Sequence, residues 1–156
     1  MGFSNVPQKQ GLYDQANEHD ACGMGFVADL HGRKSHRIVD GALEILVNLE
    51  HRGASGAEEC TGDGAGILTQ IPHSFFKSTF GDLPEIGDYG VGMLFLPLST
   101  KHREFCRKRI NEIVAEEGQT VLGWRDVPTN NASLGETSKF VEPHVCQIFI
   151  GKNNDI

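Results

Sequence analysis

The chain has 156 residues, within the usual size of one domain, and carries a net charge of −7 from 14 Lys and Arg against 21 Asp and Glu. This acidic balance argues against a general nucleic-acid-binding protein. Hydrophobic residues make up 38% of the sequence, which is enough for a core and excludes disorder throughout. The apolar stretches are far shorter than the roughly 20 residues that a membrane-spanning helix requires, so we expect no membrane segment.

The four cysteines are widely spaced and form no CxxC pair, so we expect no metal site; they are Cys22, Cys60, Cys106 and Cys146. The N-terminus has no basic start followed by an apolar core and is therefore not a secretory signal. We expect reduced thiols and a cytoplasmic protein.

Residues 1–21 are polar and show no sustained period, which predicts an extended leader rather than a core element. The composition changes at Cys22, and residues 22–30 predict a glycine-rich strand that ends at a His31-Gly32 turn. One side of this strand carries Phe26, Ala28 and Leu30.

A helix is expected next, with Ser35 as its N-cap, because apolar residues recur at a spacing near 3.6. These residues are Ile38, Val39, Ala42, Leu43, Ile45, Leu46 and Leu49. Residues 54–64 have loop composition, and residues 65–71 predict a second strand.

The rest of the chain predicts two helices and three strands. A short helical segment around Phe75 and Phe76 precedes a turn-rich connection over 81–88 and an apolar strand over 89–96. Thr100 can cap a helix that stops at Gly118, and strands follow over 120–124 and 145–150. Residues 129–139 are polar and yield no prediction. The mixed order favours an α+β class over a doubly wound parallel sheet.

Cys22 is the sharpest chemical feature, because it lies at the junction between the leader and the first predicted strand. A free cysteine is usually a small buried hydrophobe. If the leader is removed after Ala21, however, one residue carries both a thiol and a free α-amine, and that amine can act as the base that activates the thiol. Glycines on the following strand would leave room for a substrate.

Three segments resemble one family. The run CGMGFVADLHG, the helix ending in NLEHRG and the segment TGDGAGILTQIP are similar to the class II glutamine amidotransferase domain at the start of glutamate synthase large subunits. GLYDQANEHDACG upstream resembles the short propeptide of that family. Residues 1–21 are then a propeptide-like leader, and residues 22–156 are the N-terminal portion of the amidotransferase domain.

The resemblance implies an α+β fold of the N-terminal-nucleophile (Ntn) hydrolase type, with four αββα layers that are incomplete in this chain. It also implies that Cys22 attacks the side-chain amide of L-glutamine, releases ammonia and leaves a γ-glutamyl thioester that water hydrolyses to glutamate. The glycine-rich TGDGAG run precedes a predicted strand, so it does not fit a dinucleotide-binding loop.

The resemblance gives Arg52, Gly53 and Asp63 a role in ordering the site. Alternatives remain for each polar residue: Arg52 can complement the dipole of the preceding helix, and His51 can cap it. Asp63 can simply close a Gly-Asp-Gly turn. The other three cysteines are interpreted as structural or incidental.

The family builds its oxyanion hole from an Asn-Gly pair in a segment like HNGE and clamps the glutamine carboxylate with an arginine, and this sequence has no such segment. The pairs Asn130-Asn131 and Asn153-Asn154 lack that context. We therefore expect the substrate-binding residues beyond residue 156, and a fragment that is inactive by itself.

In the full-length enzyme, the resemblance implies that ammonia reaches a second site where 2-oxoglutarate is aminated at FMN beside a 3Fe-4S cluster. No cofactor or metal is expected within this chain. The partners implied are the remaining domains of the large subunit and either a small NADPH-oxidising subunit or ferredoxin. Two alternatives stay open: a class II amidotransferase of another pathway, and a non-catalytic assembly domain.

Overall fold

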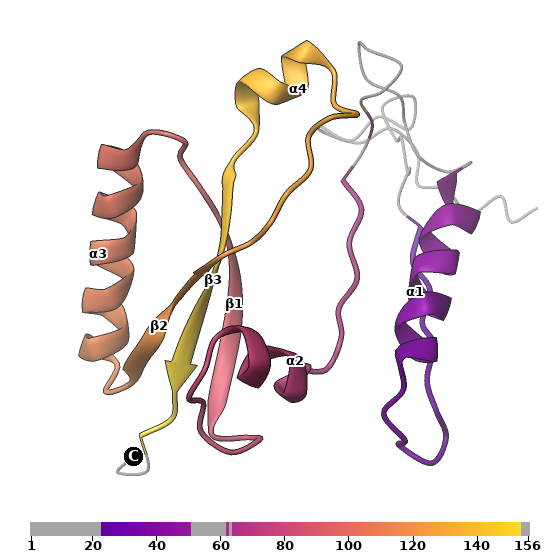
Figure 1. The fold of residues 1–156 in the computed structure, drawn as a ribbon, viewed down its shortest axis with the longest axis horizontal. Coiled ribbons are helices and arrows are strands. Elements are labelled where there is room, and N and C mark those ends of the chain that lie inside the picture. The colour runs from indigo at the N-terminus through magenta and orange to yellow at the C-terminus, as the bar shows by residue number, and fades with distance from the viewer. Residues whose placement is uncertain (1–22, 51–61, 63, 154–156) are drawn as a thin grey trace, which may run out of the picture. The chain divides into compact units, whose positions relative to one another are not determined.

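The computed structural model describes residues 23–50, 62 and 64–153. The chain divides into two compact units, the first containing the described residues up to Ile67 and the second those from Leu68 onward (Figure 1). The secondary structure comprises four helices and three strands in the described residues. The result is an α+β chain with a small antiparallel sheet.

The first unit contains helix α1 (His36–Asn48) and the extended segment that precedes it. Ser35 caps the helix as predicted, since its hydroxyl accepts a hydrogen bond from the backbone N–H of Arg37 at 3.2 Å. The predicted turn is also confirmed: the N–H of Gly32 donates to the carbonyl of Asp29 at 3.0 Å, and Gly32 has a φ of 68°. That left-handed conformation favours glycine.

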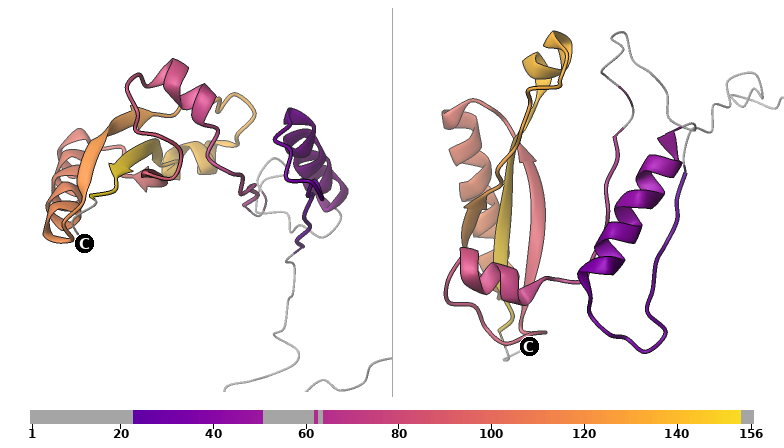
Figure 2. Two further views of the ribbon diagram at one scale, coloured as in Figure 1. Left: turned by 90° about the horizontal axis from the view of Figure 1, so that it is seen from below. Right: turned by 45° about the vertical axis from the view of Figure 1, so that its right-hand side comes forward.

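The second unit is built on a three-stranded antiparallel sheet in the order β1 (Tyr89–Leu96), β3 (His144–Gly151), β2 (Thr120–Asp126). The three strands predicted here are confirmed, β1 with the predicted bounds and the other two slightly longer. Helix α2 (His73–Thr79) and helix α3 (Thr100–Glu116) pack on opposite faces of the sheet (Figure 2). Both of these helices are predicted from the sequence.

The core of this unit centres on Phe149 in β3, whose side chain is fully buried. The ring of Phe80 stacks on it at a centroid distance of 4.1 Å, and the ring of Phe76 meets it edge-on at 5.0 Å. Gly123 permits this packing, because a Cβ there would lie 2.7 Å from Cζ of Phe80. A bulge between Val121 and Gly123 accompanies this close approach.

Helix α3 ends as the sequence predicts. The N–H of Gly118 donates to Ala115 and the N–H of Gln119 donates to Val114, which is the Schellman pattern, and Gly118 has a φ of 69°. At the other end, the predicted cap is wrong by one residue. Ser99 occupies the N-cap position and Thr100 is the first helical residue, with no side-chain capping bond from Ser99.

The strands predicted over 22–30 and 65–71 are wrong for the residues that the structure describes, which form no strand at 23–30 or 65–71. Alternating apolar residues favour extended backbone, but a strand also needs a neighbour for its ladder of hydrogen bonds. Two of the three side chains predicted to share a side, Phe26 and Leu30, are almost fully exposed. The polar stretch over 129–139, for which the sequence yields no prediction, ends within a fourth helix, α4 (Glu136–Val141).

In the described part of the chain, no helix is both long and apolar enough to cross a membrane. Several apolar side chains of the second unit are nevertheless exposed, among them Met93, Phe95 and Leu98. Met93 and Phe95 lie in β1, and Leu98 follows two residues after the end of that strand.

Candidate functional site

All four residues proposed from the sequence for the catalytic site, Cys22, Arg52, Gly53 and Asp63, lie outside the described residues, as does His51. Their neighbours in the chain are described. Gly23 directly follows Cys22, and Leu49 precedes Arg52 by three residues. The contacts of these described neighbours are therefore the structural information next to the candidate residues in the chain.

Residues 23–27 run antiparallel to α1 and contact one side of it at three successive places (Figure 1). A Cβ on Gly23 would lie 2.9 Å from Cδ2 of Leu49, and one on Gly25 would lie 2.8 Å from Cγ2 of Ile45. At the third place, a Cβ on Gly41 would lie 3.3 Å from Cγ2 of Val27.

From the sequence alone, the glycines of this segment are expected to leave room for a substrate. The structure corrects this interpretation, because the space beside Gly23 and Gly25 is filled by the side chains of Leu49 and Ile45. Met24 and Phe26, which alternate with the glycines, are 96% and 90% exposed. The segment thus has one side packed on the helix and one apolar side without cover in the described residues.

Asp29 fixes the turn that joins this segment to α1. Its carboxylate accepts hydrogen bonds from the backbone N–H of His31 at 2.8 Å and from the Arg33 guanidinium at 2.9 Å. The Arg33 side chain, together with the backbone N–H groups of Arg33 and His31, lowers the pKa of the Asp29 carboxyl. Sequence reasoning missed Asp29, although an aspartate just before a His-Gly turn, where its side chain can accept from the backbone N–H two residues on, is a recognisable turn signal.

A second polar cluster joins three elements of the larger unit. Oδ1 of Asp126, at the end of β2, accepts from Nη2 of Arg107 at 2.6 Å and lies 3.0 Å from Nε2 of His144. Hydrogen bonds from His144 and from Arg107 lower the pKa of the Asp126 carboxyl. The sequence gives no signal for this cluster, because only the pairing of β2 with β3 brings Asp126 close to His144.

This cluster stabilises the packing of the helix and strands that it joins, and it does not form a reactive site. The guanidinium of Arg107 lies over the ring of Trp124 at 5.2 Å, which ties α3 to β2. Cys146 is the nearest thiol in the sheet, but it is fully buried and cannot reach a substrate. A His–Asp pair without an accessible nucleophile does not make a catalytic triad.

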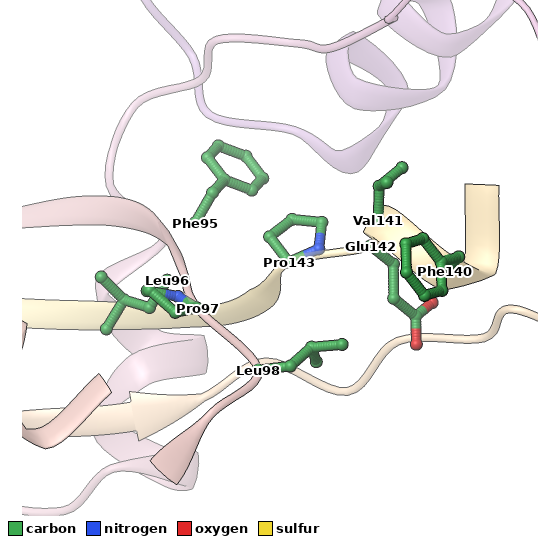
Figure 3. A pocket seen from close by; sticks show the side chains of 8 residues that line it. All are labelled: Phe95, Leu96, Pro97, Leu98, Phe140, Val141, Glu142 and Pro143. Atoms are coloured by element: carbon green, nitrogen blue, oxygen red, sulfur yellow. The ribbon is translucent and has the colours of Figure 1, made fainter. Parts of the chain in front are cut away.

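A shallow apolar groove of about 380 Å³ lies between residues 95–98 and residues 140–143 (Figure 3). Its lining contains one charged side chain, Glu142, whose carboxylate accepts a hydrogen bond from Nδ2 of Asn131 at 3.0 Å. The groove offers no cation for a phosphate group, so it does not fit a flavin nucleotide.

The asparagine pairs left unassigned by the sequence are engaged locally where the structure describes them. Oδ1 of Asn130 accepts from the N–H of Ala132, Asn131 binds Glu142, and the amide of Asn153 donates to the carbonyl of Gly118. Asn154 lies outside the described residues. Within the described ranges no three His, Cys, Asp or Glu side chains group as metal ligands.

Comparison with known proteins gives a consistent set of relatives. The family described as "Glutamine amidotransferases class-II" matches residues 22–156. The chain is 44% identical over 158 residues to the glutamate synthase [NADPH] large chain of Bacillus subtilis. It is 44% identical to the glutamate synthase [NADH] of Saccharomyces cerevisiae and 43% identical to a ferredoxin-dependent glutamate synthase of Synechocystis.

These alignments include most or all of this chain but little of the relatives. They cover 100%, 91% and 85% of the chain against 10%, 7% and 9% of the respective relatives. The chain therefore spans about a tenth or less of the length of these proteins.

Proposed function

Because the chain belongs to the class II glutamine amidotransferases, we propose that it supplies the glutaminase half-reaction of a glutamate synthase, with Cys22 as the nucleophile. The observation that carries the proposal is that the family match begins at Cys22, the residue that the sequence identifies by its position after the leader. The three relatives named above are all glutamate synthases, which supports this pathway over others of the same class.

In the proposed reaction, the α-amine of Cys22 takes the thiol proton, and the sulfur attacks the side-chain carbonyl carbon of L-glutamine. The C–N bond breaks, the amine returns the proton to the leaving nitrogen, and ammonia departs. Water then attacks the γ-glutamyl thioester, and its proton returns to the sulfur as glutamate is released. This covalent route splits one difficult amide hydrolysis into two easier steps.

The proposal requires removal of residues 1–21. A peptide bond on the Cys22 nitrogen converts a basic amine into an amide that cannot accept a proton near neutral pH. We therefore interpret residues 1–21 as a propeptide and residues 22–156 as the first part of the amidotransferase domain.

Contacts of the described residues support a site shared by Cys22 and Arg52. Gly23, the residue after Cys22, meets Leu49 at the C-terminal end of α1, and Leu49 precedes Arg52 by three residues in the sequence. In this proposal Arg52 and Gly53 order the nucleophile, while Asp63 orients the loop beneath it. These roles rest on the family resemblance.

The four-layer Ntn arrangement also belongs to the proposal. The antiparallel sheet, the packing of α3 on one face and the exposed Met93 and Phe95 on the other support a sheet that forms part of a larger layered domain. Four layers would bury such a face between two sheets.

For the whole protein, we propose that ammonia aminates 2-oxoglutarate at a distant FMN site beside a 3Fe-4S cluster. The described residues do not fit either group. Cys106 and Cys146 are the two described cysteines of the chain, and among the described residues no cluster of three possible ligands could hold an iron-sulfur cluster. Both groups would therefore be held by other domains. A small NADPH-oxidising subunit or ferredoxin would supply electrons, and the free thiols of Cys106 and Cys146 support a cytoplasmic location.

The test is a pair of substitutions in the full-length protein. Cys22→Ala removes the nucleophile, so glutamine-dependent glutamate formation should be abolished while ammonia-dependent turnover remains. Cys22→Ser keeps the shape but loses the more acidic thiol, so glutamine use should fall severely. Undiminished glutamine use by Cys22→Ala would overturn the proposal.

A further inference from the structure

We propose that Gly25 and Ile45 form a matched pair that sets the register between residues 23–27 and α1, and thereby positions the nucleophile at residue 22. The inference rests on the proposed function of Cys22. Gly25 and Ile45 are positioning residues in this account, since neither is required to touch the substrate.

The spacing of the contacts makes a repeated fit possible. Alternate residues of an extended segment are about 6.6 Å apart, at roughly 3.3 Å per residue. Positions four apart on a helix are about 6.0 Å apart, at 1.5 Å per residue. The two repeats nearly coincide, and residues 23, 25 and 27 accordingly meet helix positions 49, 45 and 41 in turn.

The sizes of the paired residues select one register. Two glycines of the segment face large helix side chains at Leu49 and Ile45, whereas the third pair is reversed, with Val27 against Gly41. A slip by two residues in one direction would drive Val27 onto Ile45. A slip in the other direction would place Gly25 against Gly41 and leave a void. The observed register is the one of these three in which every pair fits.

Gly25 is the least tolerant position in the segment. Its missing Cβ would lie 2.8 Å from Cγ2 of Ile45, a carbon attached directly to the Ile45 Cβ. A β-branched side chain in a helix has one strongly preferred χ1 rotamer, so this methyl group cannot swing aside. At Gly23 the facing atom is the end of the flexible Leu49 side chain, which can move.

The register matters for catalysis because Gly23 is bonded to Cys22 and Leu49 precedes Arg52 by three residues. A slip of one contact would move the start of the segment by about 6.6 Å along the helix. Displacements of about 1 Å at a reacting group can lower a rate by roughly a hundredfold. A displacement of the segment therefore affects the glutamine reaction first.

The experiment compares four variants of the full-length enzyme: Gly25→Ala, Ile45→Ala, the double variant Gly25→Ala/Ile45→Ala, and Gly25→Ala/Ile45→Val. Gly25→Ala should lower glutamine-dependent kcat by about tenfold or more, with ammonia-dependent turnover unchanged. The second substitution to alanine removes Cγ2, so the first double variant should return to within about threefold of Ile45→Ala alone. Valine keeps both γ carbons and should not restore the rate.

Gly90→Ala is the matched control, since a Cβ at this position in β1 meets nothing within 4 Å. It should leave both activities unchanged. The proposal is overturned if Gly25→Ala retains full glutamine turnover, if it loses both activities together, or if alanine and valine at position 45 rescue equally. These outcomes are separate from failure of the proposed function, which shows as intact glutamine use in Cys22→Ala.

Discussion

Gly25 and Ile45 approach each other so closely that a single added carbon on Gly25 would lie 2.8 Å from Cγ2 of Ile45. This relationship explains a feature of the sequence that strand patterning does not, namely why glycines alternate with large apolar residues after Cys22. The glycine side lies on α1, while Met24 and Phe26 face away from it and are exposed. Both sides of the segment are apolar or small enough to be packed, and the described residues cover the glycine side.

The N-cap of α1 should contribute measurably to stability. Ser35→Ala removes the hydroxyl that accepts the hydrogen bond from the Arg37 N–H, and it should lower the free energy of unfolding by about 1 kcal/mol. Chemical denaturation of this chain, followed by circular dichroism, measures the change. Ser35→Asn keeps a capping oxygen and should remain close to the parent chain. Equal losses for the two variants would show that the cap contributes nothing.

The aromatic core should be far more sensitive. Phe149→Ala removes a fully buried ring that contacts Phe76 and Phe80, and it should destabilise the chain by about 3–5 kcal/mol. Phe140→Ala is a suitable comparison, because Phe140 is 86% exposed and its loss should change stability by no more than about 0.5 kcal/mol. Denaturation midpoints of both variants test this, and similar midpoints would contradict the assigned core.

Asp126 should add an acid-sensitive component to stability. Its folded-state pKa is lowered by hydrogen bonds from His144 and Arg107, so its contribution is present above the unfolded pKa of about 3.9. That contribution is lost as the pH falls through the lower folded pKa. Asp126→Asn should therefore flatten the decline in stability below about pH 4.

Fluorescence of Trp124, the single tryptophan in the chain, can report the acid transition of the parent chain and of Asp126→Asn. Because Arg107 lies over its ring, this probe is adjacent to the Asp126 cluster. Parallel pH curves for the two proteins would show that Asp126 does not carry the effect. Asp126 is 66% exposed, so we expect the difference between the curves to be small.

Local patterns predict much of the fold. Apolar periodicity and the cap at Ser35 are sufficient for α1, and an apolar run between turn residues gives β1 its bounds. The segments 22–30 and 65–71 have the same kind of pattern, but extended backbone becomes a strand only beside a partner, which local sequence does not specify. Helix α4 lies in a polar stretch with no apolar period.

The candidate site can likewise be predicted only in part from local sequence. Cys22 is identified from its place at the leader junction and from the family resemblance, and its role, with those of Arg52, Gly53 and Asp63, stays a prediction. The contact of Gly25 with Ile45 depends on how the segment returns along the helix, which no local pattern specifies. The same is true of Asp126 and His144, which are distant in sequence and meet through strand pairing.

The role of Cys22 can be tested directly by labelling the full-length protein with a glutamine analogue whose side-chain amide is replaced by a chloromethyl ketone, and by locating the adduct with mass spectrometry. The thiolate would displace chloride and form a carbon–sulfur bond. We expect a mature chain that begins at Cys22, with one adduct on that residue and protection from labelling by excess glutamine. An active enzyme that still begins at Met1, or an adduct on a different residue, would contradict it.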